Sequence, residues 1–173
     1  FLLATLLTAV VLSALLPFEV RAEQVAAFEQ VTPVFVALTL LAFAVGELTG
    51  NHSQVDKLWS VVPAVYAWLF AACSDWSPRV VLLSAGITLW ALRLSFNFAR
   101  RGGFGWPPWR GVEDYRWAVL RENDLFAGHP GRFRLFHLFF ICGYQMSLVY
   151  LFTLPVLLAW TERPLGPVDG LLA

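Results

Sequence analysis

The sequence predicts an all-helical, polytopic membrane protein. Of its 173 residues, 58% are hydrophobic and only 14% are charged, whereas soluble domains average roughly 45–50% apolar and about 25% charged residues. The apolar residues lie in long runs separated by short charged stretches, which is typical of a chain that crosses a membrane several times. The net charge of zero gives no basic bias toward nucleic acid, so we expect no nucleic-acid partner.

Five segments are long and apolar enough, or nearly so, to cross the membrane. A hydrocarbon core of about 30 Å needs about 20 helical residues at a rise of about 1.5 Å each. We therefore expect one domain of about five transmembrane helices, at residues 1–16, 31–48, 58–73, 80–99 and 135–160. Pro33 and Pro63 lie near helix starts, where a missing N–H is tolerated. Pro155 marks a kink or an end late in the fifth helix.

Residues 100–134 form the one long connection between the predicted helices. Glycine and proline residues recur along it, which predicts a structured polar loop, and residues 113–121 within it are expected to form a short surface helix. Basic residues in the loops on this side outnumber those on the opposite side by eight to three. This bias places the long loop on the cytosolic, matrix or stromal face.

Three charged residues lie close to membrane depth, where each costs on the order of 2.5–3.5 kcal/mol. They are Glu47, Asp56 and Arg93. Hydrogen-bonding residues occupy most positions between the first two, so we expect one polar cluster at the cytosolic end of two adjoining helices, made of Glu47, Asn51, His52, Gln54 and Asp56. Two interpretations stay open: a carboxylate that pairs with Arg93 to hold helices together, or a binding or catalytic site.

A stripe of basic and polar residues follows one face of the fourth predicted helix. Arg93 and Asn97 lie four residues apart and so share a face, and Arg100 continues that face toward the long loop. Such a stripe is suited to hold an anionic group, for example a cofactor phosphate. The alternative is that Arg100 is an ordinary anchor at the membrane surface.

The histidines and cysteines give no sequence signal for a metal. His52, His129 and His137 lie in different segments without metal-ligand spacing, and we predict no metal site. Cys73 and Cys142 form no CxxC pattern, so we interpret them as single thiols in apolar surroundings. His137 is interpreted as an interhelical hydrogen-bonding residue of the fifth helix.

Three motifs in the middle of the chain resemble those of a known family. They are the run of residues 51–63 with Ser53, Asp56 and Trp59, the Leu-Arg-Leu around Arg93, and the Glu-Asp pair followed by an arginine within residues 111–117. Together they are similar to the steroid 5-alpha-reductase-like integral membrane family, in its mostly uncharacterised domain-of-unknown-function branch. The resemblance covers roughly residues 51–134, and Trp117 stands where the family usually has tyrosine.

The resemblance implies a membrane-embedded, NADPH-dependent reductase of lipid metabolism, acting on an enone in a steroid- or lipid-like substrate. Hydride transfer to the β-carbon is then assisted by acidic and phenolic groups that polarise the carbonyl. Carried onto this chain, the substrate-facing candidates are Glu47, Asp56 and Tyr66. The candidates nearer the NADPH phosphates are Arg93, Asn97, Arg100, Arg116 and Arg121. Membrane lipids are the expected surroundings, in the endoplasmic reticulum.

One departure from the family pattern keeps a second function open. The family has a further basic segment with an Arg-His-Pro-Asn-Tyr-type motif, which supplies much of its cofactor site. Residues 128–131 lack the Asn-Tyr of that motif, and we expect this C-terminal part to be absent. The alternative is a non-catalytic membrane subunit of a larger complex, for example a respiratory or photosynthetic one, with other membrane subunits as partners. A transporter or channel is less favoured, because no paired broken helices or internal repeat is evident.

Overall fold

The computed structural model describes residues 20–162 and 164–166, which form helices and no β-strand. The predicted all-helical class is confirmed, while the predicted helix at residues 1–16 lies outside the described residues. The elements, in chain order, are α2 (Ala22–Thr49), α3 (Gln54–Trp59), α4 (Val62–Cys73), α5 (Pro78–Arg100), α6 (Tyr115–Glu122), α7 (Pro130–Phe136), the π-helical η1 (His137–Tyr144) and α8 (Gln145–Leu158).

Within the described part of the chain, three helical stretches are long and apolar enough to cross a membrane. They are Ala22–Thr49, Pro78–Arg100 and Pro130–Leu158, the last being the continuous run of α7, η1 and α8. α4 is also apolar but has only 12 residues. The length and composition of these helices indicate an integral membrane protein, as the sequence predicted.

The first described helix begins earlier than its hydropathy indicates. α2 starts at Ala22 rather than at residue 31, because polar side chains of its first turns have partners inside the protein. Gln24 is buried, and its Nε2 donates to the carbonyl oxygens of Leu157 and Trp160, each at 3.2 Å. These bonds fix the start of α2 to the end of α8.

The third predicted helix, at residues 58–73, is instead two helices. α3 ends at Trp59 and α4 begins at Val62. The Ser60 hydroxyl donates to the carbonyl oxygen of Lys57 at 3.0 Å, and Pro63 occupies the first turn of α4, where its missing N–H is harmless. The polar run before the apolar segment is therefore helical and turns away from the axis of α4.

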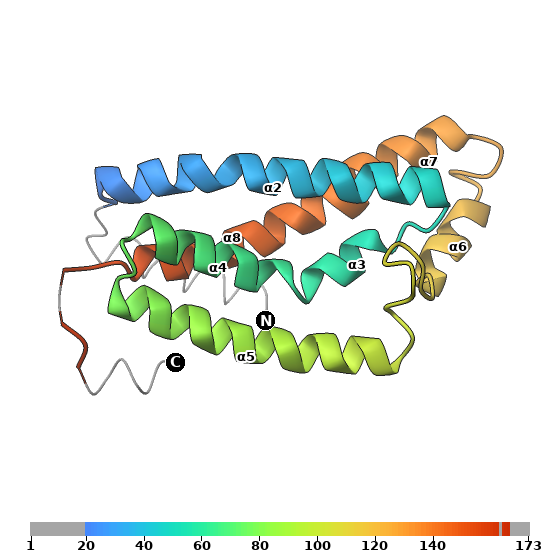
Figure 1. The fold of residues 1–173 in the computed structure, drawn as a ribbon. Helices are drawn as coiled ribbons and strands as arrows, with labels where there is room; N and C mark the ends of the chain where they lie inside the picture. The colour runs from blue at the N-terminus through green and yellow to red at the C-terminus, as the bar shows by residue number, and fades with distance from the viewer. Residues whose placement is uncertain (1–19, 163, 167–173) are drawn as a thin grey trace, which may run out of the picture.

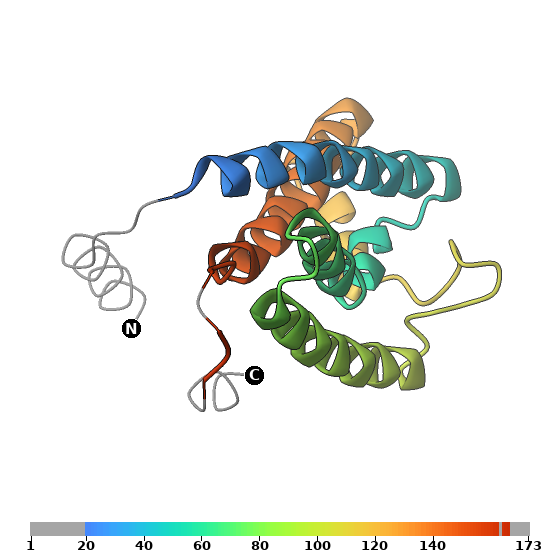
Figure 2. The same ribbon diagram turned by 60° about the vertical axis from the view of Figure 1, so that its left-hand side comes forward.

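The helices pack as a bundle around an aromatic core (Figures 1 and 2). α4 packs against both α5 and α8, and α2 packs against η1 and α8. The core includes Tyr66, Phe70, Met146 and Tyr150, all nearly inaccessible to solvent. The outer face of α5, by contrast, exposes large apolar side chains, namely Leu89, Leu92 and Phe96. Such a face is suited to contact with lipid.

One end of the bundle gathers the polar parts of the chain. α2 and α5 end there and α7 begins there, with α3 and α6 beside them (Figure 1). The long loop is fixed to α3 by Lys57, whose Nζ donates to the carbonyl oxygens of Arg110 at 2.8 Å and Pro108 at 3.2 Å. Burial lowers the pKa of Lys57. The predicted short helix at residues 113–121 is confirmed as α6.

Candidate functional site

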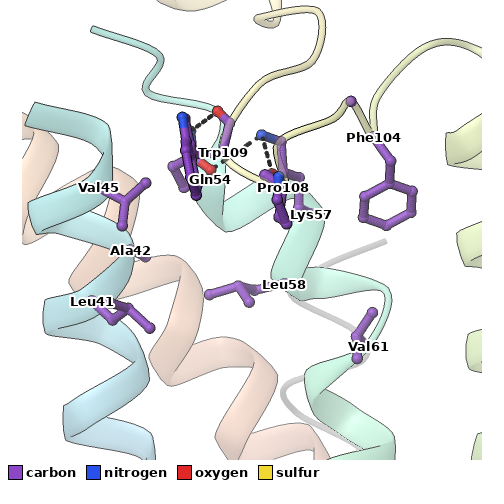
Figure 3. Close-up of a pocket in the computed structure, with 11 residues that line it drawn as sticks. Leu41, Ala42, Val45, Gln54, Lys57, Leu58, Val61, Phe104, Pro108 and Trp109 are labelled. Atoms are coloured by element: carbon purple, nitrogen blue, oxygen red, sulfur yellow. Dashed lines mark hydrogen bonds between the residues drawn. The ribbon is translucent and has the colours of Figure 1, made fainter. Parts of the chain in front are cut away.

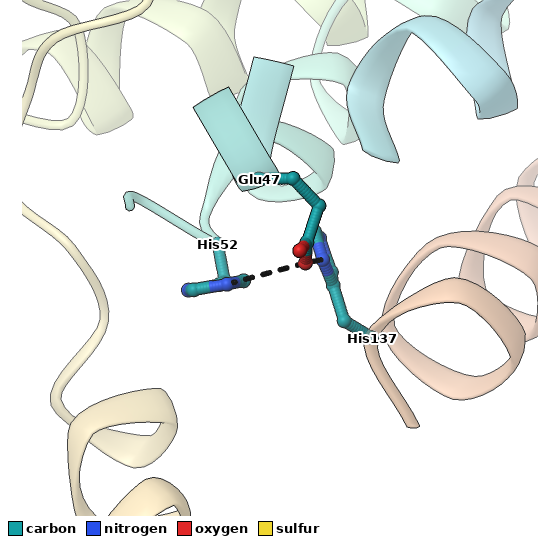
Figure 4. A group of neighbouring side chains, drawn as sticks. All are labelled: Glu47, His52 and His137. Atoms are coloured by element: carbon teal, nitrogen blue, oxygen red, sulfur yellow. Dashed lines mark hydrogen bonds and ion pairs between the residues drawn. The ribbon is translucent and has the colours of Figure 1, made fainter. Parts of the chain in front are cut away.

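A buried cluster of one carboxylate and two imidazoles lies where α2, the α2–α3 connection and η1 meet (Figure 4). Gly50 ends α2 with φ 66°, and the chain then turns so that His52 lies back toward Glu47. The Glu47 Oε1 is 2.8 Å from His137 Nδ1 and 3.7 Å from His52 Nε2. Its Oε2 accepts from Arg134 Nε at 2.7 Å. Glu47 thus pairs with Arg134 and His137, and not with Arg93.

Glu113 joins this cluster to the long loop. Its Oε1 accepts from the backbone N–H of His52 at 2.8 Å and lies 3.2 Å from His52 Nδ1. The Arg121 guanidinium donates to Oε1 at 3.0 Å and Oε2 at 2.6 Å, and its Nη1 is also 2.6 Å from His52 Nδ1. Burial alone raises the pKa of Glu113, but the hydrogen bonds from Arg121 and His52 outweigh it and the net pKa is lowered.

Asp56 lies on the other side of α3 in a separate cavity of about 450 Å³. The cavity is walled by α3, α5 and the long loop, and its apolar lining comes from Trp59, Leu94, Phe98 and Val112. Its polar lining is Ser53, Asp56, Ser60, Arg101, Glu113, Asp114 and Arg116. An apolar chamber with a few convergent polar groups is the usual form of a small-molecule site.

Burial raises the pKa of Asp56 above its ordinary value, although hydrogen bonds from Ser53 and Trp117 oppose this effect. The Trp117 Nε1 donates to Asp56 Oδ2 at 3.3 Å. Trp59, which also lines the cavity, has an indole N–H without a partner among the described residues. A carboxyl group that keeps its proton more readily makes this cavity suited to a hydrogen-bond acceptor.

An apolar groove of about 390 Å³ lies between α2 and α3, beneath the long loop (Figure 3). Leu41, Val45 and Leu58 form part of its wall, and Gln54 and Lys57 are its charged or amide side chains. Both are already bonded to the loop, Gln54 to the carbonyl oxygen of Trp109 at 3.0 Å and Lys57 as described above. The groove therefore offers mainly apolar contact, and its Gln54 and Lys57 side chains are occupied by the loop.

The other predicted site residues lie apart from both clusters. Tyr66 is in the bundle core, edge-on to Tyr150 at 5.0 Å, and lines neither the Asp56 cavity nor the groove. Arg93 lies on the exposed surface of α5 rather than in the interior. Arg93 lies about 10 Å along the axis from the end of α5. Its long side chain can extend from there toward the membrane surface. Arg100 contacts Asn97 at 3.3 Å.

The predicted arginines inside the site are already paired. Arg121 is bonded to Glu113 as described, and Arg116 donates to Asp114 through Nε at 2.9 Å and Nη2 at 2.6 Å. These hydrogen bonds lower the pKa of Asp114 and raise that of Arg116. The free guanidinium at the cavity is that of Arg101, which makes no side-chain bond to a described residue.

Sequence reasoning did not place Glu113 in the site or bring His52 and His137 together. Glu113 stands in the Glu-Asp motif of residues 111–117, and that motif is the signal that could have identified it. The two imidazole rings lie 4.5 Å apart, but they come from segments far apart in sequence. The interhelical hydrogen bond expected of His137 is confirmed by its contact with Glu47.

The fold and the polar end define a multi-pass helical membrane protein with an apolar bundle and two titratable clusters at one end. Residues 42–171 match the family described as Protein of unknown function (DUF1295). The match covers more than half of the chain, so the chain belongs to this family. The sequence resemblance is confirmed at this level, whereas kinship with the steroid reductases stays a prediction.

One curated relative extends this result. The chain is 34% identical over 152 residues to Uncharacterized protein C594.04c of Schizosaccharomyces pombe. The alignment covers 80% of this chain but 42% of that protein, so the chain spans less than half of the length of this relative. No solved structure matches the chain.

Proposed function

We propose that this chain is the N-terminal, membrane-embedded part of an NADPH-dependent reductase that reduces the C=C bond of an enone in a steroid- or lipid-like substrate. The observation that carries the proposal is the Asp56 cavity, in which a carboxyl group of raised pKa lies in a largely apolar chamber at the membrane surface. An apolar substrate with one polar end fits such a chamber.

Reduction of an enone is faster when the protein stabilises the negative charge that develops on the carbonyl oxygen. When bound, NADPH would supply a hydride to the β-carbon of the enone. Negative charge then develops on the carbonyl oxygen as an enolate, and the reduction is complete when the α-carbon takes a proton from water. A neutral carboxylic acid donates a hydrogen bond to such an oxygen, and burial favours the neutral form of Asp56. Trp59 also lines this cavity, with its indole N–H buried and without a partner among the described residues. In this proposal Asp56 is the polarising acid, and Trp117 positions it.

The cofactor phosphates require cationic partners. Arg101 and Arg116 both line the cavity. Arg116 is paired with Asp114, whereas Arg101 has no side-chain bond to a described residue, so this chain supplies part of a phosphate site. Because the chain covers 42% of its relative, we propose that the rest of the polypeptide supplies the remaining contacts. Arg93 and Arg100 lie on α5 but do not line the cavity. We propose that they contribute to phosphate binding only together with the rest of the polypeptide.

The complete natural polypeptide in detergent or nanodiscs tests the proposal. NADPH binding is followed by quenching of tryptophan fluorescence, and NADPH consumption is measured with a panel of steroidal and fatty enones. Asp56→Asn should lower turnover by about 10²–10³-fold, the loss typical of one transition-state donor, with an unchanged NADPH Kd. Asp124→Asn is the matched control, since Asp124 is exposed on the same end. Absence of NADPH binding by the complete protein refutes the proposal.

The non-catalytic subunit is favoured by a different observation. Two of the four arginines predicted to hold the cofactor phosphates, Arg116 and Arg121, already pair with carboxylates. On this hypothesis the protein co-purifies with other membrane subunits of an energy-transducing membrane and binds no nucleotide. The reductase hypothesis instead places a cofactor-binding protein in the endoplasmic reticulum, so the NADPH titration separates the two.

A further inference from the structure

We infer that Glu47, His52 and His137 form a binding site for one divalent transition-metal ion. Each residue offers a ligand atom, and these atoms all lie within 4.8 Å of one another. Both histidines are buried and Glu47 is partly buried. Two imidazoles and one carboxylate suit Zn²⁺ or Fe²⁺. The inference does not depend on the proposed reductase activity, because Asp56 lines a different cavity.

The ligand spacing is close to that of a bound ion. Zn–N and Zn–O bonds of about 2.0–2.2 Å place neighbouring tetrahedral ligands roughly 3.3 Å apart. The Glu47 Oε1 lies 2.8 Å from His137 Nδ1 and 3.7 Å from His52 Nε2. Figure 4 shows the carboxylate between the two imidazoles. Shifts of a few tenths of an ångström bring these two contacts to coordination distances. The two imidazole nitrogens lie within 4.8 Å of one another and must approach by up to about 1.5 Å to reach the same spacing.

A carboxylate already supports one of the imidazoles from behind. Metal-bound histidines usually donate their other ring N–H to a carboxylate, which orients the ring. Glu113 Oε1 lies 3.2 Å from His52 Nδ1, on the side of the ring away from Glu47. For Nε2 to bind the ion, Nδ1 must carry the ring proton and donate it to Glu113. Arg121 Nη1 lies 2.6 Å from Nδ1 and must then move away from this nitrogen, while Arg121 keeps its 2.6 Å bond through Nη2 to Glu113 Oε2.

His137 has features that an interhelical hydrogen bond alone does not explain. Its side chain is 0% exposed. The nitrogen that faces Glu47 and would bind the ion is Nδ1, whereas Nε2 packs beside Gly46 and has no partner among the described residues. His137 is also the first residue of the π-helical segment, and π-helical turns are frequent at functional sites. The imidazole packs against Gly46, where a Cβ would lie 2.6 Å from its Cε1.

Two cations bear on the occupancy of this site. Arg134 Nε holds Glu47 Oε2 at 2.7 Å, but its side chain is 67% exposed, so it can withdraw into solvent when an ion binds. Arg121 stays with Glu113. A cavity of about 350 Å³ borders Glu47, His52 and Arg134, which leaves room for water or another ligand at an open coordination position.

The test uses the complete natural polypeptide, purified without a polyhistidine tag. Elemental analysis of the native protein should find about one equivalent of a transition metal, and its identity distinguishes zinc from iron. Co²⁺ added to metal-free protein should give visible d–d absorption of a low-coordinate site. His52→Ala and His137→Ala should weaken Zn²⁺ binding more than about tenfold, and Glu113→Gln by about 10–100-fold. The exposed His129 provides the control His129→Ala, which should bind as the native protein does.

Two further variants keep the test decisive if a histidine variant fails to fold. Glu47→Gln keeps the side-chain shape but removes the anionic ligand, and should also lose the ion. Arg134→Gln removes the competing cation and should bind Zn²⁺ at least as tightly as the native protein, which a purely ion-paired cluster does not predict. Substoichiometric metal without Co²⁺ bands overturns the inference, as does equal loss of binding in His129→Ala.

Discussion

Replacing Gly46 by alanine tests whether close packing of His137 on α2 organises the whole polar end. An alanine Cβ at this position would lie 2.6 Å from His137 Cε1 and 2.9 Å from Nε2, far inside the ordinary carbon contact of about 3.5–4.0 Å. The imidazole is buried beside Phe43, with ring centroids 5.0 Å apart, and has little room to move. Gly46→Ala should therefore displace His137 from Glu47.

The expected magnitude follows from opposing effects. Alanine within a helix gains about 0.5–1 kcal/mol over glycine, while overpacking of a tight interior costs about 1–3 kcal/mol. Losing the 2.8 Å bond between His137 and Glu47 removes up to about 1.5–3 kcal/mol more. With the bond fully lost, the net change is a loss of about 1.5–5.5 kcal/mol in the free energy of unfolding.

Gly131 provides the matched control within α7. A Cβ there meets nothing within 4 Å, so Gly131→Ala should leave stability unchanged or raise it by up to about 1 kcal/mol. Unfolding of the two variants in detergent, followed by circular dichroism against temperature, should shift the midpoints in opposite directions. A Gly46→Ala protein as stable as its Gly131→Ala counterpart would show that His137 does not need this contact.

The remaining predictions concern Asp56 and Lys57, two neighbouring residues of α3. Because burial raises the pKa of Asp56, the folded state binds its proton more tightly than the unfolded chain, and stability falls as pH rises from the unfolded pKa through the folded one. Asp56→Asn should remove that slope and raise the unfolding midpoint at neutral pH, as thermal melts across the acid range will show, while Asp124→Asn should retain the slope. Lys57→Met removes a buried cation but leaves the carbonyl oxygens of Pro108 and Arg110 without this donor. Limited proteolysis should therefore cut the long loop faster than in the native protein. An unchanged rate would show that other contacts hold the loop.

Hydropathy predicted the helical class and the long loop, but not where polar residues join helices. Hydropathy could not predict the start of α2. Gln24 is polar and would be assigned to the surface, but in the fold it is bonded to carbonyl oxygens at the end of α8. The sequence of residues 54–59 predicts a polar connection, but these residues form the helix α3. The short length of α3 and the break between α3 and α4 depend on Pro63 and on the hydrogen bonds of Lys57 to the loop.

The candidate site was predicted in composition more than in arrangement. Glu47, His52 and Asp56 were expected in one polar cluster, whereas α3 carries Asp56 to one side and the preceding turn leaves His52 on the other. Polar residues that follow one another in sequence share a site only if the chain keeps them on one side, and α3 begins after His52. The approach of His137 to His52 depends on the packing of η1 against α2, which no local pattern encodes.

Glu113 links the two clusters and so decides whether they act together. It binds His52 and Arg121 on one side and lines the Asp56 cavity on the other. Glu113→Gln keeps the shape but removes the charge that holds Arg121, and should reduce stability by about 1–3 kcal/mol. The exposed Glu122 gives the control Glu122→Gln. If Glu113→Gln weakens metal binding and also changes NADPH turnover, the clusters are coupled through this carboxylate; a change in metal binding alone would make them independent sites that share one end of the bundle.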